Sequence, residues 1–282
     1  MSQGTATSGL RAVDTSGKRK HASEQTRWAE FRTKKLGSYV ALIILVTAWQ
    51  TWVTVGSVNP IVMPAPTAVA VELYRMQELG LVVPAFVLSM TSYFTGIGFA
   101  VLAGMLLSIL IGLSQLLRTV TTPYLWALFA MPRIALIPLL LLWFGLNRQL
   151  VVITVFISAI VPLVLQVVEG MRTTEGLHLR MSRMFCASKL QTFIKVILPG
   201  IVPFVANGMR SALSRGFIGL IVVELLSGTG GLGTEAMRAA RNFNTARTMA
   251  MILIMLVVAV LLVILSRVIE RSASRWRDSV AV

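Results

Sequence analysis

Long stretches without a single charged residue constrain this chain more than any other feature. Four of them are 36, 39, 20 and 19 residues long, and they cover residues 36–71, 79–117, 149–168 and 248–266. A helix needs roughly 20 apolar residues to cross the hydrocarbon core of a bilayer. Each stretch can therefore hold one membrane-spanning helix. The composition agrees, since 56% of the residues are hydrophobic and only 13% are charged, about half the charged share of a soluble domain.

Two further spans are predicted where a few charges interrupt apolar sequence. Backbone polar groups cannot stay unpaired in lipid, so the spans must be helices or strands of a closed barrel. The run Leu-Ile-Pro-Leu-Leu-Leu-Leu at 136–142 lacks the apolar–polar alternation of a barrel strand. We therefore predict an all-α membrane protein with six transmembrane helices. They are placed near residues 37–56, 88–114, 123–145, 150–168, 203–226 and 248–268.

Lysine and arginine are divided unevenly between the two sides that six spans create. The two tails and the segments 115–122 and 169–202 hold 18 of these residues, whereas the opposite segments hold five. The positive-inside rule therefore predicts that both termini are cytoplasmic. Topology and contact with lipid headgroups then account for the net charge of +15. Nucleic acid is not expected as a partner.

Three regions follow from this topology. Residues 1–35 form a cytoplasmic tail, in which 23–35 could be an interfacial helix or simply a solvated segment. Residues 36–275 form the transmembrane domain, with a cytoplasmic loop at 169–200. Residues 276–282 form a second cytoplasmic tail.

Arg133, Arg215 and Glu224 are the charges that fall within predicted spans and attract most interest. An ionisable group inside a bilayer costs at least ~2.5–3.5 kcal/mol, so it usually has a function or a partner. No acidic residue stands three or four positions from either arginine on its own helix. The arginines could line a path for an anion, or they could bond carbonyls left free by Pro132 and other helix breaks. Glu224 is a third candidate for the path, although it lies near a helix end and could simply reach the interface.

Glycine and other small residues form two patterns. Five recur at every fourth position of the second span, which predicts a close helix–helix contact within the chain or with another: Gly96, Ala100, Gly104, Ser108 and Gly112. The string Gly-Thr-Gly-Gly-Leu-Gly at 228–233 fits the dinucleotide pattern GxGxxG. That pattern requires a preceding strand, whereas a predicted span precedes it here. We expect a flexible or tightly turned loop on the outer side instead.

The predicted cytoplasmic loop at 169–200 interleaves basic with apolar residues. Met181, Phe185 and Ser188 fall on one helical face. This pattern predicts a short amphipathic helix that docks on the membrane or on a partner protein.

The same loop resembles the EAA loop of bacterial ATP-binding-cassette (ABC) importer permeases. The run Ser-Arg-Met-Phe-Cys-Ala-Ser at 182–188, followed by Val-Ile-Leu-Pro at 196–199, carries the resemblance. Other segments resemble the family in the same order along the chain, over about residues 36–275: 63–67, 132–138, 142–145, Glu224, 231–233 and 242–245. The resemblance is closest to the nitrate/sulfonate/taurine branch of binding-protein-dependent permeases.

This resemblance implies a type I importer fold that forms the translocation path for a small anionic solute. It also implies that the EAA loop forms a coupling helix in a groove of an ATPase. The coupling residues would be Arg180, Met181, Ser182, Arg183, Met184, Phe185, Cys186, Ala187, Ser188, Leu198 and Pro199. The chain departs from the family where Arg-Met-Ser at 180–182 replaces Glu-Ala-Ala and Cys186 replaces glycine.

The implied partners are a second copy of the permease, two cytoplasmic ATPase subunits and an extracytoplasmic binding protein, all at a bacterial inner membrane. The single set of spans and the small-residue stripe lead us to expect a homodimer. The chain has no GxxxxGK[ST] motif, so we predict a transport subunit rather than an enzyme. It would need no cofactor or metal of its own, because ATP and Mg²⁺ would be held by the partner ATPase.

Two alternatives remain at this stage. A stand-alone secondary transporter or channel would also need apolar spans, but it would not need a docking loop. An intramembrane enzyme is less favoured, because the spans lack paired carboxylates or a nucleophile–histidine set. The identity of the solute does not follow from the sequence.

Overall fold

The computed structural model describes residues 37, 40–174 and 184–274. The predicted tails 1–35 and 276–282 lie outside the described residues, as do the coupling candidates Arg180, Met181, Ser182 and Arg183. Every regular element in the described part is helical, as predicted.

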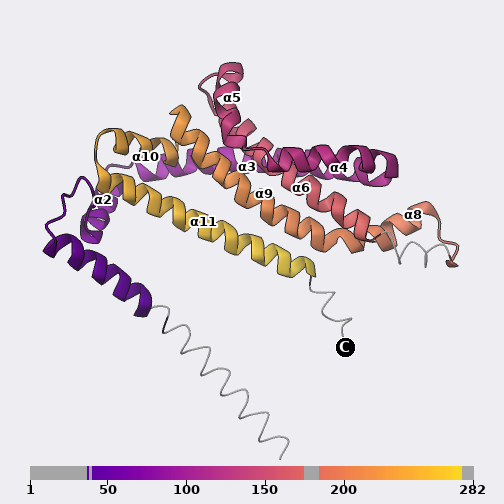
Figure 1. Ribbon diagram of the computed structural model, residues 1–282, viewed down its shortest axis with the longest axis horizontal. Coiled ribbons are helices and arrows are strands. Elements are labelled where there is room, and N and C mark those ends of the chain that lie inside the picture. Colours follow the sequence, from indigo (N-terminus) through magenta and orange to yellow (C-terminus); the bar gives the residue numbers. More distant parts are fainter. Residues whose placement is uncertain (1–36, 38–39, 175–183, 275–282) are drawn as a thin grey trace, which may run out of the picture. The chain divides into compact units, whose positions relative to one another are not determined.

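The helices of the described part are shown in Figure 1. Besides an unlabelled helix at Val40–Val55, they are α2 (Pro66–Glu78), α3 (Val82–Leu113), α4 (Gln115–Ala130), α5 (Ile137–Phe144), α6 (Arg148–Thr174), α8 (Lys189–Thr192), α9 (Leu198–Ser227), α10 (Leu232–Arg241) and α11 (Thr245–Ser274). A 3₁₀ turn at Arg133–Leu136 precedes α5, and a π-helical turn at Phe193–Ile197 precedes α9.

The chain divides into two compact units. One comprises residues 1–59 and 65–67, and its described part centres on helix Val40–Val55. There the backbone N–H of Thr67 donates to Oε1 of Gln50 over 3.3 Å. The other unit comprises residues 60–64 and 68–282 and contains the remaining helices, except for the first two residues of α2.

Four helices of the described chain are long and apolar enough to cross a membrane. They span Val82–Leu113, Arg148–Thr173, Ile194–Ser227 and Thr245–Val268, and they match four of the predicted spans. The pair Gln115–Ala130 and Arg133–Phe144 gives a fifth span if it is counted as one. Helix Val40–Val55 is shorter than these spans, so the six-helix count stays a prediction.

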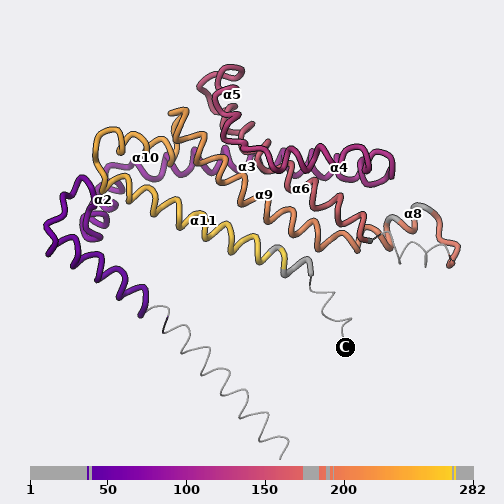
Figure 2. Tube along the Cα trace, viewed as in Figure 1, coloured from indigo at the N-terminus to yellow at the C-terminus, as the bar shows by residue number. Residues whose placement is uncertain are grey.

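The third predicted span, 123–145, is not one straight helix. Its two halves are bent by 85° at residues 131–132, and Figure 2 shows α5 leaving the line of α4. Pro132 has no N–H, and its ring disfavours helical geometry at the residue before it. Met131 accordingly has an extended backbone, with ψ of 132°. The first half also begins earlier than predicted, at Gln115, where Ser114 caps it by accepting from the N–H of Leu117.

α6 is the central helix of the larger unit. In its most apolar window 67% of the residues are buried, against 28–33% for the other three long helices. α3 and α9 pack against it through glycines. A Cβ at Gly96 of α3 would lie 2.8 Å from the carbonyl of Val152, and one at Gly219 of α9 would lie 2.5 Å from Oγ of Ser158. The small-residue stripe is therefore occupied by α6 of the same chain, and it no longer supports a homodimer.

This packing makes Gly96 a test of the helix–helix contact. Gly96→Ala is expected to lower the apparent melting temperature in detergent, since an extra methyl against a backbone carbonyl costs about 1–3 kcal/mol. On the same helix, a methyl group added at Gly98 would meet nothing within 4 Å. Gly98→Ala is therefore the matched control, and it should be neutral or slightly stabilising. Equal melting temperatures for the two variants would contradict the close contact.

Two helices, α2 and α10, lie in segments that connect predicted spans. α2 and α10 bury a small apolar cluster with α11, which includes Val69, Met76, Leu232, Ala236 and Met251. Nε of Arg247 donates to Oε1 of Glu72 over 2.8 Å, which joins α11 to α2.

Candidate functional site

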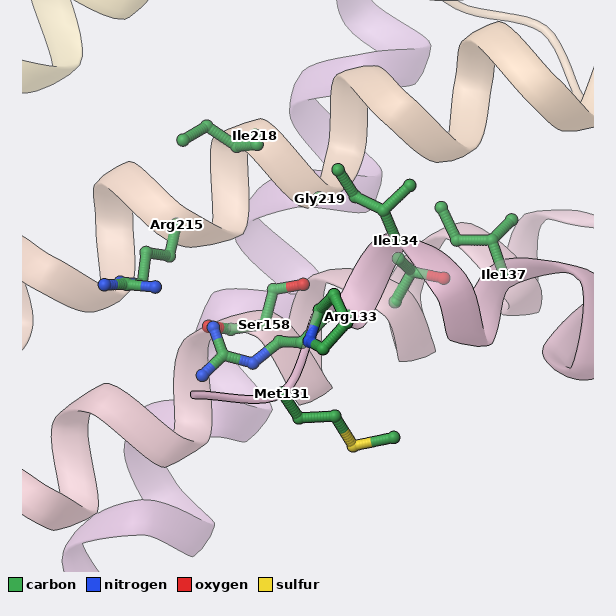
Figure 3. Close-up of a pocket in the computed structure, with 10 residues that line it drawn as sticks. Met131, Arg133, Ile134, Ile137, Ser158, Arg215, Ile218 and Gly219 are labelled. Carbon is green, nitrogen blue, oxygen red and sulfur yellow. The ribbon is translucent and has the colours of Figure 1, made fainter. Parts of the chain in front are cut away.

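Two of the predicted path residues, Arg133 and Arg215, meet at one pocket. It has a volume of about 210 Å³ and lies between the break after α4, the middle of α6 and the middle of α9. Figure 3 shows both guanidinium groups turned toward the same side of it. The lining residues are Met131, Pro132, Arg133, Ile134, Ile137, Thr154, Ser158, Arg215, Ile218 and Gly219.

Arg133 is held by two backbone carbonyls. Its NH1 donates to the carbonyl of Ser158 over 3.4 Å, and its NH2 donates to the carbonyl of Leu128 over 3.5 Å. In a regular helix these carbonyls would accept from the residues four positions later, which are Pro162 and Pro132. Proline has no N–H to donate. Arg133 therefore satisfies the two acceptors that these prolines leave free, as one of the two interpretations of the sequence anticipated.

Arg215 is held differently. Among the described residues it has no hydrogen bond or carboxylate partner. Its Cζ instead lies over the ring of Phe129, 4.3 Å from the centroid. The Cζ of Arg133 lies 6.0 Å from the same centroid. Two cations thus share one aromatic ring, with no carboxylate among the pocket's lining residues, which favours an anion in the pocket.

Glu224 does not line this pocket. It is 1% exposed, and its Oε1 accepts from Oγ of Ser89 over 2.7 Å while its Oε2 accepts from the N–H of Gly233 over 2.9 Å. Oγ of Ser89 in turn accepts from the N–H of Leu232 over 2.9 Å. These hydrogen bonds tie Glu224 to α3 and to the start of α10. Its role in the translocation path stays a prediction.

The network fixes residues 228–231 of the glycine-rich string as a tight turn that leads into α10, one of the two forms expected. Gly230 and Gly231 have φ of 96° and 92°, a region that favours glycine. A Cβ at Gly231 would also collide with Oε1 of Glu224. Glycine is needed here for both backbone conformation and space.

The described part of the coupling loop departs from the helix that the sequence predicts there. Helical geometry stops at Met184, and Phe185 and Cys186 form a turn before α8. Cys186 is exposed and has φ of 49°, which is typical of the glycine that ends a helix. A residue in this conformation cannot continue a helix, which explains the break.

Ser188 starts the next helix with a capping box. Its Oγ accepts from the N–H of Gln191 over 3.2 Å, and its own N–H donates to Oε1 of Gln191 over 3.0 Å. Before this cap, Met184 and Phe185 are 82% and 81% exposed. Ala187 and Pro199 are half-buried and Leu198 is exposed. The loop therefore presents two large apolar side chains beside an ordered helix start.

Phe129 is the site residue that sequence reasoning missed. A lone aromatic residue in an apolar span gives no signal of its own. Only the bend at Pro132 and the position of α9 bring it under Arg215.

Residues 100–275 match the family model described as a binding-protein-dependent transport system inner membrane component. The chain is 27% identical over 259 residues to a taurine transport system permease protein of Escherichia coli, covering 90% of this chain and 94% of that protein. It is 29% identical over 238 residues to a putative aliphatic sulfonates transport permease protein of Bacillus subtilis, covering 84% and 86%.

A third relative is a nitrate import permease protein of Leptolyngbya laminosa, 28% identical over 176 residues and covering 62% of each chain. Among solved structures, the fold is similar to a chain of the MetNI methionine ABC transporter in an inward-facing conformation. The TM-score is 0.57 at 20% identity, over 70% of this chain and 98% of that one.

Proposed function

The chain belongs to the inner-membrane components of binding-protein-dependent transport systems, and from this premise we propose how it moves its solute. It is a multi-pass permease subunit of an ABC importer in the bacterial inner membrane. We propose that it forms six transmembrane helices with both termini in the cytoplasm. The Lys/Arg distribution supports this topology.

The proposed solute is a small anion, passing the pocket of Arg133 and Arg215. The observation that carries this proposal is the pair of cations facing a 210 Å³ cavity with no carboxylate among its lining residues. The names of three relatives, which refer to taurine, aliphatic sulfonates and nitrate, support the same class. All of these carry an anionic group.

The proposed assembly has two copies of this chain, two ATPase subunits and an extracytoplasmic binding protein. The homodimer now rests on the single set of spans alone. Native mass spectrometry in detergent that found only one permease copy with its ATPase would contradict it. ATP and Mg²⁺ belong to the ATPase in this proposal, because the chain has no P-loop motif.

Transport would follow a two-state cycle. ATP binding changes the ATPase surface, and a docked loop passes that change to the spans through its different binding energy in the two states. The exposed Met184 and Phe185 are proposed as the contact, with the remaining coupling residues of 180–188, Leu198 and Pro199 around them. Family membership does not favour the alternative of a stand-alone transporter, and co-purification with a P-loop ATPase distinguishes the two.

Cys186 gives a direct test of topology and docking. It is the only cysteine and is exposed, so a membrane-impermeant maleimide should label it in inside-out vesicles stripped of ATPase. Restoring the ATPase should reduce labelling sharply, because docking covers the loop. Right-side-out vesicles should not label.

The two parts of this experiment fail separately. Labelling from outside would overturn the cytoplasmic placement of the loop. Equal labelling with and without ATPase would leave the topology intact and refute the docking surface.

A further inference from the structure

The two arginines of the pocket are not equivalent. Two nitrogens of Arg133 donate hydrogen bonds to the carbonyls of Ser158 and Leu128. Arg215 donates no hydrogen bond to a described residue, and its cation–π contact with the ring of Phe129 is its only observed support. A guanidinium presents its N–H donors at the edge of its plane. The contact with the ring of Phe129 involves no hydrogen-bond acceptor, so the N–H donors of Arg215 have no hydrogen-bond partner among the described residues.

The ring of Phe129 is itself held in place. It stands in the last turn of α4, two residues before the break. The ring of Trp126 packs edge-on against it, with centroids 5.9 Å apart and planes at 79°. The position of Arg215 is therefore set by a supported aromatic ring rather than by polar bonds that an anion would have to displace.

We propose that Phe129 is a positioning residue for anion passage: it holds the Arg215 guanidinium with its N–H edge available, so that Arg215 rather than Arg133 contacts the anion. This inference rests on the proposed function and deepens it. Without the ring, Arg215 would lose its only observed support and move away from the neighbouring charge of Arg133. The anion would then have to fix a mobile side chain when it binds, at a cost in affinity.

The test uses the whole transporter, with permease, ATPase and binding protein, in proteoliposomes. Phenylglyoxal modifies exposed arginines, and peptide mass spectrometry reports Arg215 and Arg133 separately. Ethanesulfonate and nitrate are the anion probes. Phe129→Leu removes the ring, Phe129→Tyr keeps it, and Phe99→Leu is a control that removes an exposed aromatic residue from α3.

We expect Phe129→Leu to raise the modification rate of Arg215 about threefold, as the cation–π contact is lost, while Arg133 changes little. The anion concentration that half-protects Arg215 should rise about tenfold, equivalent to 1.4 kcal/mol. Phe129→Tyr and Phe99→Leu should behave like the parent protein. A purely structural role for Phe129 would not act on Arg215 selectively.

Two contrary results distinguish failure of the role proposed for Phe129 from failure of the anion pocket on which that role depends. If both anions protect Arg215 equally in the parent and in Phe129→Leu, the role of Phe129 is refuted and the anion pocket stands. If neither anion protects Arg215 in the parent protein, the anion pocket is refuted and this proposal falls with it. If Phe129→Leu does not assemble, Phe129→Met fills the space without a ring and is judged by the same two outcomes.

Discussion

Uptake through the transporter is expected to fall about 10- to 100-fold when Arg133 and Arg215 are both replaced by glutamine. A hydrogen bond to a charged group contributes about 1.5–3 kcal/mol, and 1.4 kcal/mol corresponds to a factor of ten. Glutamine keeps a polar side chain but removes the charge that compensates an anion in the pocket. Uptake of labelled taurine, an aliphatic sulfonate and nitrate into proteoliposomes measures the effect.

The single variants rank the two arginines. Arg215→Gln should reduce uptake with normal assembly, whereas Arg133→Gln should also lower thermal stability, because two carbonyls lose their donor. Arg238→Gln, on the exposed side of α10, is the matched control. Normal transport by both single variants would show that these charges are structural or irrelevant to passage.

The second large effect is expected at Glu224. Glu224→Ala removes the acceptor for Ser89 and for the N–H of Gly233, both buried. Each unsatisfied buried group costs about 1–3 kcal/mol, and the empty volume adds to this. We expect most of the variant protein to be lost from the membrane fraction, as measured by size-exclusion chromatography of detergent extracts.

Two comparisons sharpen this prediction. Glu224→Gln keeps the shape and one acceptor oxygen, so it should be intermediate. Glu169→Ala on α6 removes only a surface pair with Arg172 and should assemble normally. Wild-type amounts of Glu224→Ala would show that the glycine turn is held by other contacts.

The long apolar helices could be predicted from the sequence because hydrophobic length alone decides them. α3, α6, α9 and α11 each contain a stretch that matches the bilayer core. Pro132 also indicated an interruption of the third span. The bend of 85° could not be predicted, because the angle depends on how both halves pack against other helices.

The site was only partly predictable. Their position within predicted spans singled out Arg133 and Arg215 as separate candidates. The sequence did not show that both line one pocket, because this depends on how closely α9 approaches the break after α4. Pro132 in the break after α4 and Pro162 in α6 leave free the two carbonyls that Arg133 binds, and no local sequence pattern links these prolines. α2 and α10 were missed for a different reason. They are short and carry charged residues, so the search for uncharged stretches did not detect them.

The glycine contacts on both sides of α6 have a mechanical consequence. Val155 and Leu163 of α6 fill the space that glycines leave on α3 and on α9. Side chains seated in such gaps resist gradual sliding, since packed interfaces shift between discrete arrangements. We therefore expect α3, α6 and α9 to move together as one rigid body. Bending during transport is then expected at the break between α4 and α5, which also carries Arg133.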